Sequence, residues 1–260
     1  MRNLQADLKM RIFAFIPARF ASHRFPGKPL APISGRPMIQ HVYMRAMACQ
    51  EFTDVFVATD DTRIADCVSQ FGGHAVMTGK EHRSGTDRIY EAAVKTGVAE
   101  EDIIINIQGD QPLFDPSIVS DLVRPLKEDP SVSVSTLKWK IKNQADICNP
   151  NHVKVVTDKN GYALYFSRAP VPYFRDEDTE KTYYKHLGFY GYSMGFLALF
   201  TRLSEGVLEA SERLEQLRVL EHGYRIKVIE TALNSIEVDV PGDIAVVEHA
   251  LSSMSGSLFC

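Results

Sequence analysis

Cysteine is scarce in this sequence, and the four cysteines form no recognisable site. Cys49, Cys67, Cys148 and Cys260 include no C-x-x-C pair and have no histidine companions at metal-ligand spacing. This excludes the common zinc-binding patterns. We therefore predict free thiols in a reducing compartment.

Long apolar runs are missing as well. No segment approaches the ~20 consecutive apolar residues that a membrane-spanning helix needs. The opening stretch, MRNLQADLKM, lacks the apolar region of a secretory signal. We expect a cytoplasmic protein with no membrane insertion.

An excess of one charge sign is also absent. The net charge is −4, and 45% of the 260 residues are hydrophobic. The overall charge of the chain therefore does not favour binding to nucleic acid. Any binding site for an anion must depend on a local group of positive charges. A chain of this length and apolar content is able to bury one large core, so we predict a single domain over residues 1–260.

The first half of the sequence contains a regular alternation of strand and helix patterns. Residues 12–16 form a short apolar run that Pro17 ends, typical of a strand covered on both faces. Three further strand patterns follow, separated by apolar residues at helical spacing: 55–58, 75–77 and 103–107. This alternation predicts an α/β fold with a mostly parallel central sheet flanked by helices.

The pattern changes after Val132. Strands are expected at 132–139, 153–157 and 163–167, with a hairpin turn between the last two. We predict an antiparallel insertion over residues 132–168, suited to an acceptor-binding wall or a dimer contact. The rest of the chain predicts strands at 187–192, 226–229 and 236–239, an amphipathic helix at 208–220 and a final helix that Pro241 opens.

A cationic loop follows the first strand. It carries Arg19, Arg24 and Lys28, and Pro26-Gly27 shape the turn before the lysine. Open α/β sheets bind ligands at the carboxyl ends of their strands, where backbone N–H groups and fixed positive charge favour a polyanion. A solvated basic surface loop is the alternative, because charged loops are common.

Two carboxylates also stand at predicted strand ends. Asp110 follows the run at 103–107, and Asp239 ends the segment EVD. At one edge of the sheet they would suit a Mg²⁺ ion bound with nucleotide phosphates, whereas each alone is typical of a cap or turn. Lys28 is followed by Pro29, which excludes a Walker motif, and no G-x-G-x-x-G follows a strand.

These residues belong to a series of motifs that extends from about residue 12 to residue 251. The motifs occur in the order IPARFASHRFPGKPL (16–30), SGTDR (84–88), QGD (108–110), NPNHVK (149–154), YALYFSR (162–168), HLGFYGY (186–192) and LEQLR (214–218). Together they resemble the 3-deoxy-manno-octulosonate (Kdo) cytidylyltransferases, the CMP-Kdo synthetase family.

The resemblance implies a nucleotide-diphospho-sugar transferase-like fold. It also implies an enzyme that couples CTP to an acidic eight-carbon sugar, giving the CMP-sugar and pyrophosphate for lipopolysaccharide biosynthesis. Mg²⁺ is the implied cofactor, and a homodimer is the implied assembly. These expectations come from the family and not from composition or spacing.

The resemblance further assigns roles to individual residues. Those implied to bind CTP are Arg19, Arg24, Lys28, Ser84, Gly85 and Arg88, and those implied to hold Mg²⁺ are Asp110 and Asp239. The catalytic candidates are Lys28, Arg19 and Asp110. Those facing the sugar are Gln108, His186, Tyr190, Glu215 and Gln216, with Arg168 near its carboxylate. Without the resemblance, the strand residues are ordinary half-buried positions and the helix residues are solvated ones.

One departure from the family bears on the sugar. Much of the family has Gly-Asp-Glu-Pro where this chain has Gly-Asp-Gln-Pro, with Gln111 in place of the glutamate. In this respect, and in Phe25 and Asp87, the chain resembles the branch that activates 8-amino-3,8-dideoxy-manno-octulosonate. Both sugars stay open, with the amino sugar slightly favoured.

Two other functions also stay open. A nucleotide-binding regulatory module of this fold would have lost turnover, which the presence of Lys28, Asp110 and Asp239 disfavours. A sugar-1-phosphate nucleotidyltransferase would need additional basic residues for the acceptor phosphate. The segments 186–192 and 214–218 offer mainly hydroxyl, amide, imidazole and carboxylate groups, which suit a polyol.

Overall fold

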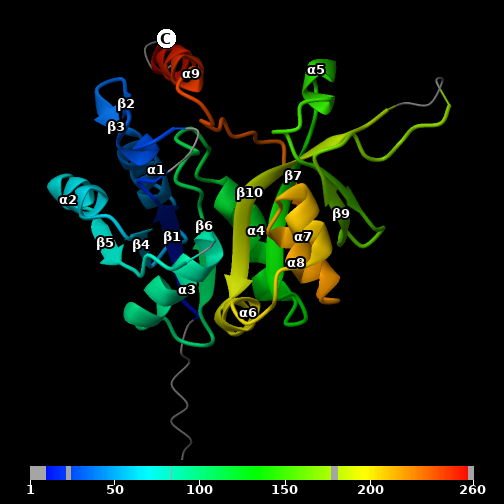
Figure 1. The fold of residues 1–260 in the computed structure, drawn as a ribbon, viewed down its shortest axis with the longest axis horizontal. Helices are drawn as coiled ribbons and strands as arrows, with labels where there is room; N and C mark the ends of the chain where they lie inside the picture. Colours follow the sequence, from blue (N-terminus) through cyan, green and yellow to red (C-terminus); the bar gives the residue numbers. More distant parts are fainter. Residues whose placement is uncertain (1–9, 22–24, 83, 177–180, 257–260) are drawn as a thin grey trace, which may run out of the picture.

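The computed structural model describes residues 10–21, 25–82, 84–176 and 181–256. Within these ranges the chain forms a nine-stranded sheet whose main path runs β11-β7-β10-β6-β1-β4-β5 (Figure 1). The strands on this path are β1 (Ile12–Ala18), β4 (Asp54–Thr59), β5 (His74–Met77), β6 (Ile103–Asn106), β7 (Val134–Lys140), β10 (Tyr184–Ser193) and β11 (Lys227–Glu230). Neighbours on the path are parallel except around β10, which is antiparallel to β6 and β7. The predicted α/β fold with a mostly parallel sheet is confirmed.

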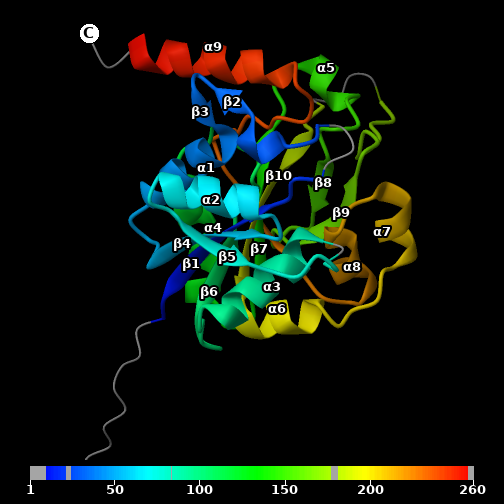
Figure 2. The same cartoon turned by 60° about the vertical axis from the view of Figure 1, so that its left-hand side comes forward.

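Helices cover both faces of this sheet (Figure 1 and Figure 2). One face carries α1 (Met38–Met47), α2 (Thr62–Gln70) and α4 (Ile118–Glu128), and the other carries α3 (Gly85–Lys95), α6 (Met194–Phe200) and α8 (Gln216–Glu221). Side chains of β1 alternate between these faces. Ile12, Ala14 and Ile16 pack in the first core, and Phe13 and Phe15 pack in the second.

Pro17 does not end β1, so this part of the sequence prediction is wrong. The strand continues to Ala18, with Pro17 opposite Ala58 and Ala18 opposite Thr59 of β4. Proline lacks the N–H donor, and near the end of a strand this removes only one possible ladder hydrogen bond. The strand therefore carries the chain further toward the loop that begins at Arg19.

The segment predicted as an insertion, 132–168, is divided in the structure. Its first strand, β7, lies within the main sheet, whereas β8 (Lys154–Thr157) and β9 (Ala163–Ser167) form an antiparallel hairpin attached through the pairing of β8 with β10. The short helix α5 (Gln144–Ile147) lies between β7 and β8 in the chain. The inserted part is therefore smaller than predicted, although β7 is also antiparallel to its neighbour β10.

Two predicted elements of the last third are wrong. The helix expected at 208–220 consists of α7 (Val207–Glu212) and α8, because Arg213 between them is left-handed with φ 54°. The strand expected at 236–239 is reduced to a single bridge between Ile236 and Leu113. Apolar spacing continues across both breaks, so the sequence pattern does not reveal them.

The remaining elements close the fold near the loop of Lys28. They are η1 (Lys28–Leu30), the small hairpin of β2 (Pro32–Ile33) and β3 (Arg36–Pro37), and the last helix, α9 (Asp243–Gly256). Ile33 and Val247 of these segments form a third, small core together with Met38 of α1. Across the described ranges, no helix has both the length and the apolar character required to cross a membrane.

Candidate active site

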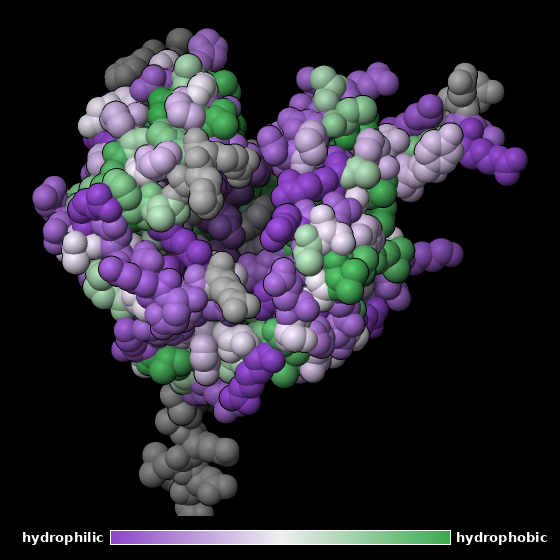
Figure 3. Space-filling model, in the orientation of Figure 1, coloured by the Kyte–Doolittle hydropathy of each residue, from purple (hydrophilic) through white to green (hydrophobic). Residues whose placement is uncertain are grey.

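A cavity of about 580 Å³ opens at the carboxyl end of β6, on the sheet face that carries α3, α6 and α8. Its apolar lining belongs to the core of that face and includes Val134 and Tyr192. Its lining includes these predicted sugar and metal residues: Gln108, Asp110, Arg168, His186, Tyr190, Glu215, Gln216 and Asp239. Figure 3 shows the molecule hollowed between the part that carries α9 and the part that carries β8 and β9, with hydrophilic residues around the hollow.

Lys28 contacts Asp110, which lines this cavity, and the preceding turn positions the lysine. Gly27 has φ 73°, and a Cβ there would lie 3.2 Å from the ring of Phe20, so the position suits glycine. The Lys28 ammonium donates to the Asp110 carboxylate at 2.6 Å and to the carbonyl oxygen of Val238 at 2.9 Å. The lysine thereby joins the cationic loop to the segments of both predicted metal ligands.

The loop that carries Asp110 is held from two sides. Gly109 lies against β1, where an added Cβ would be 2.8 Å from the carbonyl oxygen of Pro17. On the other side, the Val238 N–H donates to the Asp110 carbonyl oxygen at 2.9 Å. Asp239 follows directly, and its own N–H donates to Asp243 at the start of α9 at 2.7 Å. These contacts bring Asp110 and Asp239 to the same cavity, and their role as metal ligands stays a prediction.

Glu237 is a third carboxylate of the cavity, and the sequence analysis missed it. Its carboxylate pairs with the Lys185 ammonium at 3.1 Å. Burial raises the pKa of Glu237, the neighbouring lysine opposes this shift, and the negative charges of Asp110 and Asp239 add to it. The available signal was its position two residues before Asp239, because alternate residues of an extended segment share a side.

The amino end of α3 lies next to the cationic loop. Ser84 caps the helix by accepting from the Asp87 N–H at 3.1 Å, and its carbonyl oxygen accepts from the Arg19 guanidinium at 2.8 Å. A Cβ added to Gly85 would lie 3.3 Å from the Pro17 ring. The structure thus brings Arg19, Ser84 and Gly85 together at a helix start, an arrangement that favours anions.

Arg88 and Arg24 are not seen in the cavity. Arg88 is fully buried behind it, where its guanidinium donates to the Thr78 hydroxyl at 2.5 Å and pairs with Asp60 at 3.1 Å. A direct contact with the nucleotide would require Arg88 to move, whereas a supporting role for the loop at Thr78 fits its present contacts. Arg24 lies outside the described residues.

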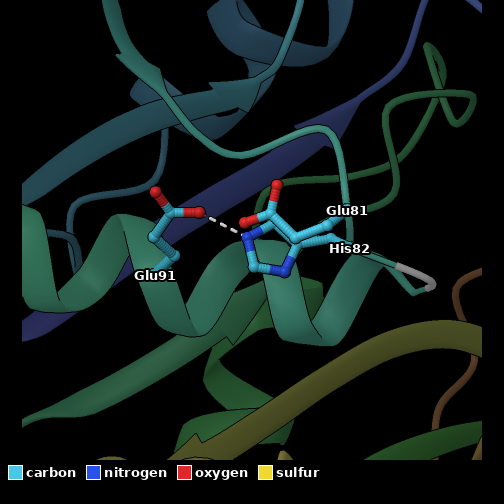
Figure 4. Close-up of side chains that lie close together, drawn as sticks. All are labelled: Glu81, His82 and Glu91. Carbon is cyan, nitrogen blue, oxygen red and sulfur yellow. Dashed lines mark hydrogen bonds and ion pairs between the residues drawn. The ribbon is translucent and has the colours of Figure 1, made fainter.

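A cluster of Glu81, His82 and Glu91 lies beside this helix start (Figure 4), with ligand atoms close enough to share a metal ion. Both Glu91 oxygens already accept hydrogen bonds. One accepts from Lys95, and the other accepts from His82 and from the Gly79 N–H. These partners lower the pKa of Glu91 to about 2, although burial opposes them. In this structure the cluster fastens the 79–82 loop to α3.

His186 and Tyr190 form the inner wall of the cavity. Their rings pack together with centroids 5.3 Å apart, and the His186 ring also meets Phe166 edge-on at 5.0 Å. Burial lowers the pKa of His186 to about 3, and the charge of Lys185 acts in the same direction. Burial also raises the pKa of Tyr190. Both residues are therefore uncharged at neutral pH.

Glu215 and Gln216 lie where α8 begins. Burial raises the pKa of Glu215, and contacts with the hydroxyls of Ser84 and Thr86 partly oppose this shift. One Glu215 oxygen, Oε1, is buried with no hydrogen-bond partner among the described residues. Glu215 therefore links the amino end of α3 to the predicted sugar wall.

Arg168 lines the cavity, but its guanidinium is engaged with the protein backbone. It donates to the carbonyl oxygens of Glu212 at 2.7 Å, Pro150 at 2.9 Å and Arg213 at 3.4 Å. These contacts connect the end of β9 to the turn between α7 and α8. The predicted contact of Arg168 with a sugar carboxylate stays a prediction, and only donors not used by these carbonyls would serve it.

Comparison with known proteins places this arrangement in a family. The family model described as cytidylyltransferase matches residues 13–231. The chain belongs to the cytidylyltransferase family. A 3-deoxy-manno-octulosonate cytidylyltransferase of Desulfosudis oleivorans is 51% identical over 246 residues, which cover 95% of this chain and 99% of the relative.

Two more members of the cytidylyltransferase family bear on the site. An 8-amino-3,8-dideoxy-manno-octulosonate cytidylyltransferase of Shewanella halifaxensis is 51% identical over 244 residues, covering 94% of this chain and 99% of the relative. A solved CMP:2-keto-3-deoxy-manno-octonic acid synthetase in complex with CTP is 42% identical, with a TM-score of 0.87 and coverage of 94% and 99%. The family assignment and the identity of this protein as a nucleotidyltransferase are thereby confirmed.

Proposed function

We propose that the protein transfers the cytidylyl group of CTP to a 3-deoxy-manno-octulosonate sugar and releases pyrophosphate, as a step toward lipopolysaccharide. The observation that supports this best is the contact of Lys28 with Asp110 and Val238 at a cavity whose inner wall carries the uncharged His186 and Tyr190. A lysine beside carboxylates suits a triphosphate with its metal ion, and an uncharged polar wall suits a polyol.

The residues of the cavity fit a Mg²⁺ ion. Asp110 and Asp239 offer hard carboxylate oxygens, the ligands that this ion prefers. Burial is the main cause of the raised pKa of Glu237, and the negative charges of Asp110 and Asp239 raise it further. A divalent cation beside these carboxylates would offset that negative charge. Asp110 and Asp239 would hold the ion, and when bound it would neutralise charge on the transferred phosphate.

The proposed reaction is an in-line displacement at the α-phosphorus of CTP. The anomeric hydroxyl oxygen of the sugar forms the new bond to phosphorus, the bond from phosphorus to the pyrophosphate oxygen breaks, and the hydroxyl proton leaves to solvent. Lys28 would stabilise the charge that develops on the phosphate oxygens. Arg19 and Arg24 would hold the triphosphate. Ser84 and Gly85 would contact the nucleotide, and Arg88 would support the loop at Thr78.

The opposite wall would orient the sugar. Gln108, His186, Tyr190, Glu215 and Gln216 supply amide, imidazole, phenol and carboxyl groups within one cavity. Positioning the sugar hydroxyl next to the α-phosphorus converts an encounter between two molecules into a local step, which alone accelerates such reactions strongly. No covalent intermediate with the protein is needed.

The identity of the sugar is the finer part of the proposal. We slightly favour the 8-amino sugar over Kdo, because Gln111, Phe25 and Asp87 resemble the amino-sugar branch. The relatives named above do not separate the two, since one of each kind is 51% identical to this chain. The homodimer and the cytoplasmic location also stay predictions.

The deciding experiment measures pyrophosphate release from CTP and Mg²⁺ with Kdo, with its 8-amino analogue and with a hexose 1-phosphate. We expect turnover with at least one of the two octulosonates and none with the hexose phosphate. Turnover with the hexose phosphate alone would establish a sugar-1-phosphate nucleotidyltransferase instead. CTP binding without turnover of any acceptor would establish a regulatory module.

A further inference from the structure

Two buried amide oxygens in the cavity have no hydrogen-bond partner among the described residues. They are Asn106 Oδ1 and Gln111 Oε1, on residues that are 2% and 1% exposed and that line the cavity. Buried amide groups nearly always have a partner, because leaving one unpaired is costly. Unpaired oxygens in a cavity wall are therefore positions at which a hydrogen-bond donor binds, from ordered water or from a ligand.

Both residues belong to the same part of the cavity. Asn106 ends β6 and lies opposite Tyr190 of β10, and Gln111 follows in the loop after β6. The register of β10 shifts between Leu187 and Tyr190, and a Cβ added to Gly188 in this bulge would lie 3.4 Å from Gln111 Nε2. The bulge re-aims β10 at this point and leaves room for the glutamine.

His186 adds a third acceptor to this wall. The Thr136 hydroxyl has one proton, which it donates to the Phe189 carbonyl oxygen at 2.7 Å, so it accepts from His186 Nε2 at 3.0 Å. The imidazole proton therefore resides on Nε2, and Nδ1 is left as an acceptor. No described residue donates to this Nδ1 atom in the hydrogen bonds of the structure.

A wall of unpaired acceptors selects among the ligands of the proposed reaction. Phosphate oxygens are acceptors themselves and would gain nothing here, whereas hydroxyl groups bring donors. CTP also carries donors, in its ribose hydroxyls and cytosine amine, but Asn106 lies opposite Tyr190 of the proposed sugar wall, which favours the sugar. We propose that Asn106 and Gln111 are specificity-determining residues whose amide oxygens accept hydrogen bonds from two hydroxyl groups of the acceptor sugar. This inference rests on the proposed function and refines it, since neither residue was among the predicted sugar contacts.

The test compares Michaelis constants of full-length variants at saturating CTP. Gln111→Met and Asn106→Leu remove the amide at similar side-chain size, and each is expected to raise the KM for the sugar about tenfold while the KM for CTP stays unchanged. Gln111→Glu and Asn106→Asp keep an acceptor oxygen and are expected to restore the sugar KM to within about threefold of wild type. Gln144→Met, at an exposed position of α5, is the matched chemical control.

Sugar analogues that each lack one hydroxyl identify the partner groups. For the hydroxyl that pairs with Gln111, the Gln111→Met variant and the wild type should have equal KM values within about twofold, because the contact is already lost. The inference would be overturned if both apolar variants had the wild-type KM for the sugar. It would also be overturned if no analogue removed the difference in KM between variant and wild type. Either result would leave the proposed function standing. Absence of wild-type turnover with both octulosonates overturns both. If Asn106→Leu fails to fold, the Gln111 variants in the loop decide.

Discussion

The two sides of the cavity satisfy their polar groups in different ways. On the side of η1 and the 236–239 segment, cations and carboxylates pair with one another, Lys28 with Asp110 and Lys185 with Glu237. On the side of β6 and β10, the buried oxygens of Asn106 and Gln111 have no described partner. The charged side thus pairs lysines with carboxylates within the protein, whereas the proposed sugar would supply the donors that the neutral side lacks.

This difference predicts different kinetic effects for the two sides. A ligand at the charged side exchanges one set of ion pairs for another, so the free energy gained on binding the ground state is small. The side chains there stabilise the transition state more, because charge develops on the phosphate in that state. A ligand at the neutral side satisfies hydrogen bonds in the ground state and transition state alike. Changes on the charged side should therefore lower kcat, and changes on the neutral side should raise the KM for the sugar.

The largest effect is expected from Asp110→Ala. This change removes a proposed metal ligand and the partner of Lys28, so Mg²⁺-dependent pyrophosphate release should fall by at least about a thousandfold. The thermal midpoint should change little, because this ion pair is partly exposed and such pairs contribute little to stability. Asp121→Ala, on the surface of α4, is the control and should keep full activity. A folded Asp110→Ala variant with a tenth of wild-type turnover would remove Asp110 from the proposed metal site.

Lys28→Ala separates transition-state from ground-state stabilisation on the charged side. We expect kcat to fall about a hundredfold with a small change in the KM for CTP, because the ammonium should act where charge develops. Lys159→Ala, in the exposed turn between β8 and β9, is the matched control. An effect confined to the KM for CTP would show that Lys28 contributes plain binding, and the kinetic distinction between the two sides would fail.

Gly109→Ala tests how rigidly the charged side is positioned. Its Cβ would lie 2.8 Å from the Pro17 carbonyl oxygen, so the Asp110 loop must shift. We expect kcat to fall about tenfold and stability to fall by about 1–3 kcal/mol, measured by steady-state kinetics and urea denaturation. Gly242→Ala, whose Cβ would meet no atom within 4 Å, should change neither. Wild-type activity in a destabilised Gly109→Ala variant would mean that the loop tolerates displacement.

The sequence predicted where Arg19 and Asp110 leave the sheet, because the rule behind that prediction is local. Apolar runs such as 12–16 and 103–107 identify buried strands, and the residues just beyond them, Arg19 and Asp110, must emerge at the same sheet edge. The ion pair between Lys28 and Asp110 was found only in the structure. Pro17 and Arg213 show the limits of local rules, since a strand tolerated a proline near its end and a helix broke at a residue other than glycine or asparagine.

Contacts between segments distant in sequence were harder to predict on both sides of the cavity, because they depend on long-range packing. The Lys185–Glu237 pair forms only because the 236–238 segment runs along the loop after β6, a contact that no periodicity specifies. Likewise, the neutral state of His186 follows from burial by strands distant in sequence. The identity of His186 as a site residue came from family resemblance, and its protonation state required the structure.

The smallest expected effect is the dependence of stability on the protonation of His186, which tests whether the neutral side is uncharged. Its folded pKa of about 3 lies below the value near 6.5 of the unfolded chain, so the unfolded state binds the proton first. Stability should therefore be lost as the pH falls from about 6.5 toward 3, with His186 contributing up to about 1.4 kcal/mol per pH unit. In His186→Gln, urea denaturation between pH 7 and 4 should give a shallower slope, whereas the exposed His249→Gln should parallel wild type. Equal slopes in wild type and His186→Gln would mean that the imidazole protonates freely in the folded protein despite the charge of Lys185, and the wall would then not be neutral.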